Sequence, residues 1–243
     1  MRFQLISDLH TEFHRDNGDA MLKSFDPTDV DLLIVAGDFS SGHYIEPTMG
    51  ALCAKYPHVA FVLGNHEFYK SDPRVTQERA RAAVAKYTNL TWLDESVVEV
   101  AGKRIIGTTM WFPRDTGREQ DRNGLNDFRL IRHFTDWVFM KNQLAQEFLR
   151  RELRAGDIVV THHLPSPRCI HPKYAGSPIN KYFVCDMEAL ITERQPRYWL
   201  FGHTHEQVRE RIGNCELIAN PFGYLGVEPE ANRRFGERLV FEI

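Results

Sequence analysis

The sequence predicts an α/β fold in which about ten strands form two sheets that pack face to face under a cover of helices. Two observations predict this class. Short runs rich in Leu, Ile and Val alternate with amphipathic segments of helical period. Several of these runs end in polar residues, and open α/β sheets place their ligand sites at such strand ends.

Five apolar runs are each followed at once by a motif of polar residues. They are Arg2–Ser7, Asp31–Ala36, Val59–Leu63, Asp157–Thr161 and Tyr198–Phe201. Their composition suits strands that are buried on both faces. Five further strands are expected, with a hairpin turn at residues 101–103. They are Thr91–Trp92, Val97–Val100, Arg104–Thr109, Glu216–Ala219 and Leu239–Phe241.

Three segments have the apolar spacing of helices. They are Ile45–Tyr56, Arg74–Tyr87 and Phe139–Arg154. Pro73 lies at the expected start of the second helix, a position that proline favours. In the third helix, Leu144, Phe148 and either Ala145 or Leu149 are expected to share the buried face.

Two long stretches without a clear period are expected to be loops, Phe112–Trp137 and Pro165–Phe183. Long loops in compact domains are often functional, although surface loops without a role are nearly as common. The side chains in or beside these stretches that could contact a substrate are Trp111, Asn126, Asp127, Arg129, His171, Asn180 and Tyr182. No repeat or linker divides the chain, so residues 1–243 are expected to form one domain.

The composition is that of an ordinary globular protein, with 42% hydrophobic and 26% charged residues. A net charge of -3 gives no basic excess for coating nucleic acid, and no apolar run approaches the roughly 20 residues of a membrane span. Met1 leads straight into a strand-like run without a signal-peptide pattern, so a cytoplasmic location is expected. The cysteines lack metal-site spacing and are expected to be free thiols; they are Cys53, Cys169, Cys185 and Cys215.

Five short motifs contain the nitrogen and oxygen ligands that a two-metal hydrolytic site needs. They are Asp8-Leu9-His10, Gly37-Asp38, Gly64-Asn65-His66-Glu67, Thr161-His162-His163 and Gly202-His203-Thr204-His205. Any one of them could be an ordinary turn or cap at a strand end. Together they supply a coordination shell for two metal ions that share one carboxylate.

Spacing within the motifs indicates which side chains can act together. Asp8 and His10 are two residues apart, so at a strand end they point the same way and can reach one metal ion. The pair His203 and His205 repeats this spacing.

The remaining polar residues of the motifs are less constrained. His162 and His163 are adjacent and face opposite ways on a strand, so only one of them is expected to be a ligand. Glu67 is expected to support backbone amides at the start of a helix rather than to perform chemistry. Glu12 and His14 lie close to the first motif, but the sequence requires no role for either.

The complete motif series resembles that of the calcineurin-like metallophosphoesterases. It extends from residue 8 to residue 205 in the family order and so covers most of the chain. The resemblance implies a four-layer α/β/β/α sandwich of two mixed sheets, with two metal ions at the carboxyl ends of central strands. Members of the family typically use iron, manganese or zinc.

The resemblance also implies a role for each motif residue. The ligands of the first ion would be Asp8, His10, Asp38 and His205. The ligands of the second would be Asp38, Asn65, His162 and His203, with Asp38 bridging the two ions. His66 would be the catalytic residue, which protonates the leaving-group oxygen or stabilises the charge of the transition state.

Departures from individual subfamilies narrow the expected reaction. After Gly37-Asp38 the chain continues Phe39-Ser40-Ser41-Gly42, without the Asp-Arg pair of protein Ser/Thr phosphatases. The DNA nucleases of the family carry a capping domain, for which this chain is expected to have no room. The pattern is similar to compact bacterial-type phosphodiesterases, so the expected substrate is a small-molecule or nucleotide phosphodiester, without stable binding of nucleic acid or membrane. The alternatives are a phosphomonoesterase and a non-catalytic binding protein of the same fold.

Overall fold

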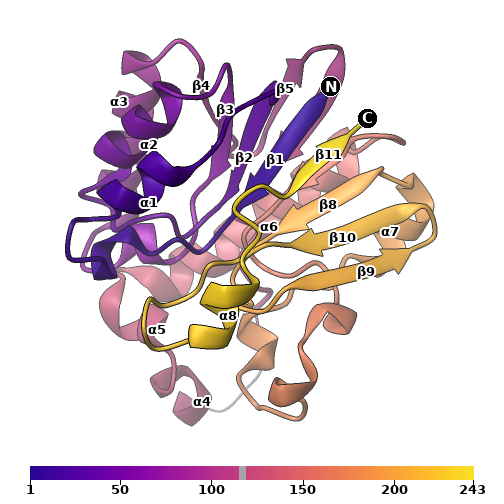
Figure 1. The fold of residues 1–243 in the computed structure, drawn as a ribbon. Helices are drawn as coiled ribbons and strands as arrows, with labels where there is room; N and C mark the ends of the chain where they lie inside the picture. Colours follow the sequence, from indigo (N-terminus) through magenta and orange to yellow (C-terminus); the bar gives the residue numbers. More distant parts are fainter. Residues whose placement is uncertain (115–118) are drawn as a thin grey trace.

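The computed structural model describes residues 1–114 and 119–243 and contains two β-sheets with helices on their outer faces (Figure 1). The strands are β1 Arg2–Ile6, β2 Leu32–Ala36, β3 Val59–Val62, β4 Leu90–Trp92, β5 Ser96–Val100, β6 Lys103–Gly107, β7 Ile158–Val160, β8 Tyr198–Phe201, β9 Val208–Ile212, β10 Cys215–Ala219 and β11 Val240–Glu242. Their order is β11-β1-β2-β3-β4 in one sheet and β5-β6-β7-β8-β10-β9 in the other. The expected α/β class, with two mixed sheets covered by helices, is confirmed.

Both sheets are parallel at their centres and antiparallel only at their edges. Strands β1 to β4 run parallel, and β11 pairs antiparallel with β1. In the second sheet β6, β7, β8 and β10 run parallel, with β5 and β9 antiparallel at the edges. Parallel strands end at the same edge of a sheet, so the five motifs, which follow β1, β2, β3, β7 and β8, gather at strand carboxyl ends.

The helices connect these parallel strands and cover the sheets. They are α1 Asp19–Ser24, α2 Ile45–Cys53, α3 Pro73–Lys86, α4 Glu119–Asn123, α5 Asn126–Leu130, α6 Phe134–Glu152, α7 Glu188–Arg194 and α8 Pro229–Arg234. The three helices expected from the sequence correspond to α2, α3 and α6. The start of α3 is as expected, because Pro73 occupies its first turn while the Asp72 side chain accepts a hydrogen bond from the Arg74 backbone N–H (2.9 Å).

Three apolar clusters hold the layers together. Between the sheets lie side chains that include Leu5, Ile34, Val62, Val160 and Leu200. A second cluster packs α1, α2 and α3 on the five-stranded sheet, and a third packs the end of α6 and α7 on the six-stranded sheet. Because burial of apolar surface is the main stabilising contribution to folding, these clusters fix the sheets and therefore the loops at the strand ends.

The expected buried face of α6 is wrong at one position. Leu144 is 44% exposed, whereas Ala145, Phe148 and Leu149 are buried. The helix also begins earlier than expected, and its buried residues recur at the helical period from Phe134 onward. Leu144 lies outside that stripe. The helix expected from the sequence lacks the first buried residues of α6, so the centre of the buried face is predicted too close to Leu144.

Of the two expected loops, one contains helices and the other is irregular. The stretch Phe112–Trp137 contains α4, α5 and the start of α6, and its residues 115–118 lie outside the described part of the chain. The stretch Pro165–Phe183 is irregular as expected and contains three short 3-10 turns, Pro167–Cys169, Pro172–Tyr174 and Asn180–Tyr182. The sequence does not predict β9, whose charged residues face solvent in alternation.

All four cysteines are free, as expected. Within residues 1–114 and 119–243, no helix has the length and apolar character that crossing a bilayer demands.

Truncation of two leucines on α6 tests the corrected face of this helix. Leu149→Ala removes a fully buried side chain and is expected to lower the free energy of unfolding by about 2–5 kcal/mol. Leu144→Ala is the matched control, and its exposed position limits the loss to about 0.5 kcal/mol. Urea unfolding followed by circular dichroism measures both. Equal losses for the two variants would contradict the assignment of the buried face.

Candidate metal centre

The five motifs converge at the carboxyl ends of the parallel strands. The backbone N–H of Asp8 donates to Gly37 O (3.0 Å) and that of His10 donates to Asp38 O (3.0 Å), so the first two motifs run side by side. The motif after β8 joins them, because the backbone N–H of His203 donates to Asp8 Oδ1 (2.9 Å). Backbone hydrogen bonds and the Asp8 carboxylate thus fix segments that are far apart in the sequence to one another.

A left-handed backbone conformation marks many of the motif residues. The φ angles are 52° for Asp8, 46° for His10, 51° for Asp38, 67° for His203 and 50° for His205. Side-chain-bearing residues adopt this region rarely, at a cost of about 1–2 kcal/mol each. Such strain concentrates at functional sites. Here it turns the chain sharply as each strand ends and directs polar side chains to one place.

Two motif glycines are required by close packing. A Cβ atom on Gly64 would lie 2.1 Å from Asp38 Oδ1, and one on Gly37 would lie 2.4 Å from His162 Nδ1. Gly37 also has a φ of 84°, which favours glycine. The absence of a side chain at both positions therefore lets Asp38 and His162 approach the backbone of neighbouring loops.

The first group of potential ligand atoms comes from Asp8, His10, Asp38 and His205. One atom from each of these side chains lies within 4.8 Å of all the others. The Nε2 atoms of His10 and His205 are 3.0 Å apart, and His205 Nε2 lies 3.6 Å from Asp8 Oδ1. All four residues are buried. The structure thus brings together the four residues that the resemblance implies for a first metal ion.

The second group contains Asp38, His162 and His203, whose ligand atoms meet the same 4.8 Å criterion. Asn65 joins it, because its Oδ1 lies 3.0 Å from His162 Nε2. His162 Nε2 also lies 3.4 Å from Asp38 Oδ2. The buried Nε2 of His203 has no hydrogen-bond partner among the described residues, as expected of an atom that binds a metal ion. Asp38 therefore belongs to both groups.

Groups behind the ligands orient two of the imidazoles. His162 Nδ1 lies 2.8 Å from Ala36 O, and His205 Nδ1 lies 2.7 Å from Glu228 Oε2. With both Nδ1 atoms donating, the Nε2 atoms present lone pairs to the site. Metal-binding histidines usually donate their other ring N–H to a carbonyl or carboxylate in this way.

The buried charges of the site act strongly on one another. Burial would lower the pKa of His162, but the carboxylate of Asp38 raises it to about 9. Burial would raise the pKa of Asp38, but His162 and His66 hold it well below its ordinary value. Burial, together with His163 and His162, lowers the pKa of His203 well below the usual range. A metal ion would therefore meet a neutral His203 and replace the proton of His162.

His66 lies in the 3-10 turn His66–Phe68, outside the two groups that share Asp38. Its Nδ1 is 3.0 Å from Glu12 Oε1 and its Nε2 is 3.0 Å from the hydroxyl of Tyr224. A further group of potential ligand atoms combines His66 with His10 and Glu12, in which Glu12 Oε1 already bonds His66 Nδ1. Two contacts thus fix the plane of this imidazole beside the site.

Glu67 ties the ligand loops together. Its carboxylate accepts hydrogen bonds from the backbone N–H groups of Asp38 (3.1 Å), Ser40 (3.0 Å) and Gly64 (2.6 Å). Glu67 supports backbone amides, as expected, but the expected location at the start of a helix is wrong, because these amides belong to the loops after β2 and β3.

The neighbouring histidines after β7 have different surroundings. His162 lies among the potential ligands, whereas His163 is fully buried with its Nδ1 3.4 Å from Thr109 O. The ring of His163 packs 4.4 Å from that of His203. His163 thus supports a potential ligand from behind.

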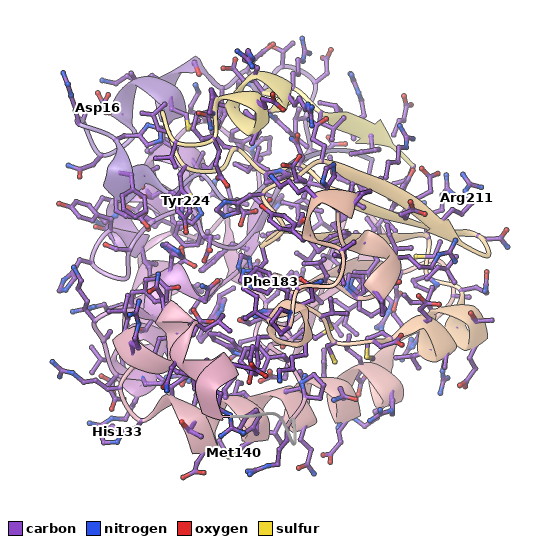
Figure 2. The ribbon with its side chains drawn as sticks, turned by 90° about the horizontal axis from the view of Figure 1, so that it is seen from below. Asp16, His133, Met140, Phe183, Arg211 and Tyr224 are labelled. Carbon is purple, nitrogen blue, oxygen red and sulfur yellow. The ribbon has the colours of Figure 1, made fainter. Side chains whose placement is uncertain are left out.

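A cavity of about 290 Å³ adjoins both groups of potential ligands. Two labelled residues of Figure 2 line it: Phe183 lies near the middle of the face viewed from below, and Tyr224 lies above and to the left of Phe183. Of the loop residues that could contact a substrate, four line the cavity, and they are Asn126, Asp127, His171 and Asn180. Trp111 and Tyr182 are instead buried in apolar packing, and Arg129 bonds the side chain of Asn126.

Three residues of the site are missed by the sequence reasoning. Glu12 and Tyr224 contact His66, and Glu228 contacts His205. A usable signal exists for Tyr224 and Glu228, because their loop follows β10, another parallel strand with its carboxyl end at the site. For Glu12 the signal is its position two residues after His10 in the first motif loop.

The chain belongs to the calcineurin-like phosphoesterase family, whose model matches residues 1–207. An uncharacterized protein of Acanthamoeba polyphaga mimivirus is 22% identical over 253 residues, and the match covers 90% of each chain. The fold is similar to that of the phosphopantetheinyl hydrolase from Mycobacterium tuberculosis, with a TM-score of 0.74 and 17% identity over 99% of this chain and 95% of that one. The family assignment agrees with the resemblance of the motif series.

Glu67→Gln tests the structural role of this carboxylate. The replacement puts an NH₂ group against a backbone N–H donor, so the free energy of unfolding is expected to fall by about 1–3 kcal/mol. Glu99→Gln, at an exposed position of β5, is the control and should leave stability unchanged. Urea unfolding measures the difference. Unchanged stability together with lost phosphoesterase activity would instead assign Glu67 to the chemistry.

Proposed function

We propose that this protein is a dinuclear metal-dependent phosphoesterase that hydrolyses phosphodiesters of small molecules or nucleotides. The observation that carries the proposal is that Asp38 belongs to two adjacent groups of buried ligand atoms. A carboxylate that bridges two ions is the central requirement of a two-metal hydrolytic site. Membership in the phosphoesterase family supports the reaction class.

The ligand types fit manganese, iron or zinc. Imidazole nitrogen and carboxylate oxygen together suit these ions better than magnesium or calcium, which prefer oxygen alone. The first ion would be held by Asp8, His10, Asp38 and His205, and the second by Asp38, Asn65, His162 and His203. When bound, such ions supply Lewis acidity toward a phosphoryl group and lower the pKa of water.

His66 is proposed to protonate the leaving-group oxygen. It lines the cavity, and Glu12 holds its Nδ1 so that Nε2 faces the cavity beside Tyr224. Burial would lower the pKa of His66, but the carboxylates of Asp38 and Glu12 raise it above the ordinary value. A protonated imidazole that is fixed in orientation is suited to general acid catalysis.

The extent of the cavity supports a diester over a monoester. A diester carries two organic groups on one phosphorus and needs room on both sides of it. The cavity extends from His66 and Tyr224 to Ile170 and Ile179 in the segment 165–183. The Mycobacterium tuberculosis protein is named a phosphopantetheinyl hydrolase, so phosphopantetheinyl esters belong in a substrate screen beside cyclic nucleotides and short oligonucleotides.

We also propose that residues 1–243 form one domain. The family match ends at residue 207, but β10 and β11, which follow it, pair with β8 and β1. Both sheets would lose strands if the last segment folded separately.

Hydrolysis of chromogenic esters by the manganese-loaded protein tests the function. We expect bis-p-nitrophenyl phosphate to be cleaved with a higher kcat/KM than p-nitrophenyl phosphate. Asp38→Ala removes the shared carboxylate, so it is expected to lose both ions and to lower kcat/KM by more than about 1,000-fold. Elemental analysis measures the bound metal.

Asp29→Ala, at an exposed acidic position, is the matched control and should keep both ions and full activity. An Asp38→Ala variant that retains two ions would contradict the bridging role. A protein that binds two ions but hydrolyses neither ester would be a binding protein of the same fold.

His66→Ala tests the proposed acid. Turnover is expected to fall about 100- to 10,000-fold while both ions stay bound. The loss should be larger for an alkyl ester than for a p-nitrophenyl ester, because p-nitrophenolate leaves without needing a proton. A series of diesters with leaving groups of increasing pKa measures this dependence.

Variants of Glu12 test whether the orientation of the His66 imidazole matters, in addition to its presence. Glu12→Ala should show the same dependence on the leaving group, whereas Glu12→Gln keeps an acceptor for Nδ1 and should retain more of the rate. His43→Ala, at an exposed position, is the control. An equal loss for every leaving group, or loss of metal from His66→Ala, would contradict the assignment.

A further inference from the structure

One wall of the cavity, formed by residues 124–126 and 164–183, presents apolar and uncharged polar side chains, and its Phe183 ring stacks on that of His203 (4.3 Å). Leu125, which precedes α5, contributes to it together with Leu164, Ile170, Ile179 and Phe183 from the segment that follows β7. The polar side chains of the same wall are uncharged amides and hydroxyls or an imidazole. They are Asn126, Tyr174, Ser177, Asn180 and His171.

No Arg or Lys side chain lines the cavity within the described part of the chain. The segment 165–183 contains three basic residues, and each forms an ion pair with an acidic residue. The pairs are Arg168 with Glu210 (4.0 Å), Lys173 with Glu206, and Lys181 with Asp121 (2.7 Å). Proteins bind additional phosphate or carboxylate groups with Arg and Lys side chains, and this wall presents none.

The two acidic residues of the cavity outside the ligand groups serve the ligands. Asp127 accepts hydrogen bonds from Asn65 Nδ2 (2.9 Å) and from the hydroxyl of Tyr69 (2.7 Å). Glu228 contacts His205. Their carboxylates face the ligand groups and would repel any second anionic group of a substrate.

We infer that the organic group of the substrate that fills this wall is uncharged and partly apolar, so that a single phosphoryl group carries the whole charge of the bound molecule. This inference rests on the proposed function, which places the phosphoryl group at the metal centre. The volume of about 290 Å³ lies at the lower limit of small-molecule pockets, which span about 300–1,000 Å³. The site thus favours diesters with a compact neutral arm over nucleoside polyphosphates, oligonucleotides and phosphorylated peptides.

Binding of matched phosphonates tests the inference without requiring turnover. The probes are the monomethyl esters of pentylphosphonic, 4-carboxybutylphosphonic and 4-(trimethylammonio)butylphosphonic acid, which differ only in the charge at the end of the arm. Calorimetry with the manganese-loaded protein measures their affinities. The pentyl probe is expected to bind at least about tenfold more tightly than either charged probe, because the wall offers a charged end no partner.

Arginine substitutions in the wall supply a cationic partner for the carboxylate of the charged probe. Ile179→Arg is expected to strengthen binding of the carboxylate probe and to abolish the preference for the pentyl probe. Tyr174→Arg places the same charge at an exposed position of the wall. This variant replaces Ile179→Arg in the binding experiment if Ile179→Arg does not fold. Met140→Arg is the matched control, because Met140 lies on the surface of α6, outside the cavity lining, and near the edge of the face in Figure 2.

The outcomes separate this inference from the proposed function. Equal or tighter binding of a charged probe by the unaltered protein overturns the inference, even if the protein hydrolyses diesters. A tenfold preference for the pentyl probe without turnover of any ester supports the inference about the ligand and overturns the hydrolase. Failure of all three probes to bind also overturns it.

Discussion

The structure depends on the placement of one buried carboxylate, that of Asp38. One of its oxygens accepts the backbone N–H of His66 (2.8 Å), while the other lies 3.4 Å from His162 Nε2 and 3.9 Å from His10 Nε2. A buried carboxylate is costly unless hydrogen bonds or opposite charges compensate it. The loops after β1, β3 and β7 thus all contribute to this compensation, so the two sheets are coupled through a polar cluster as well as through their apolar interface.

The fold supports this cluster by making the strand ends rigid. The parallel strands deliver the motifs to one end, and Glu67 then ties the loops after β2 and β3 through three backbone N–H groups. The left-handed backbone of Asp8, Asp38 and His203 can persist only because such contacts outweigh its strain. Burial of the apolar clusters thus stabilises the fold, and part of this stabilisation offsets the strain of the polar loops.

The sequence predicts the candidate metal ligands better than the residues around them, for a physical reason. Short apolar runs followed by Asp, Asn or His specify both a strand and the edge at which it ends, so local pattern predicts that the motifs gather there. The division of their residues into two ligand groups comes from the resemblance to the family. Tyr224 and Glu228 escape this reasoning because they act through contacts with residues over 20 positions away, which only the folded chain defines. The rotation of α6 escapes it because Leu144 is apolar yet lies beside the buried stripe, where tertiary packing overrides composition.

The candidate metal ligands and the side chains proposed to select the substrate come from different parts of the fold. The ligand groups lie on strand ends that the sheets hold rigidly, whereas the neutral wall of the cavity comes from α5 and from the irregular segment 165–183. The basic residues of that segment pair with acidic partners and so hold the loop rather than serve the cavity, as Lys181 does with Asp121. A change of side chain at Ile170 or Ile179 can therefore alter which organic group is accepted without moving Asp38. The wall and the centre also touch directly, because Asp127 accepts a hydrogen bond from Asn65 (2.9 Å) and the ring of Phe183 stacks on that of His203 (4.3 Å). Substitutions at Ile170 or Ile179 avoid these contacts, so they are the ones that can change the substrate while the ligand groups stay in place.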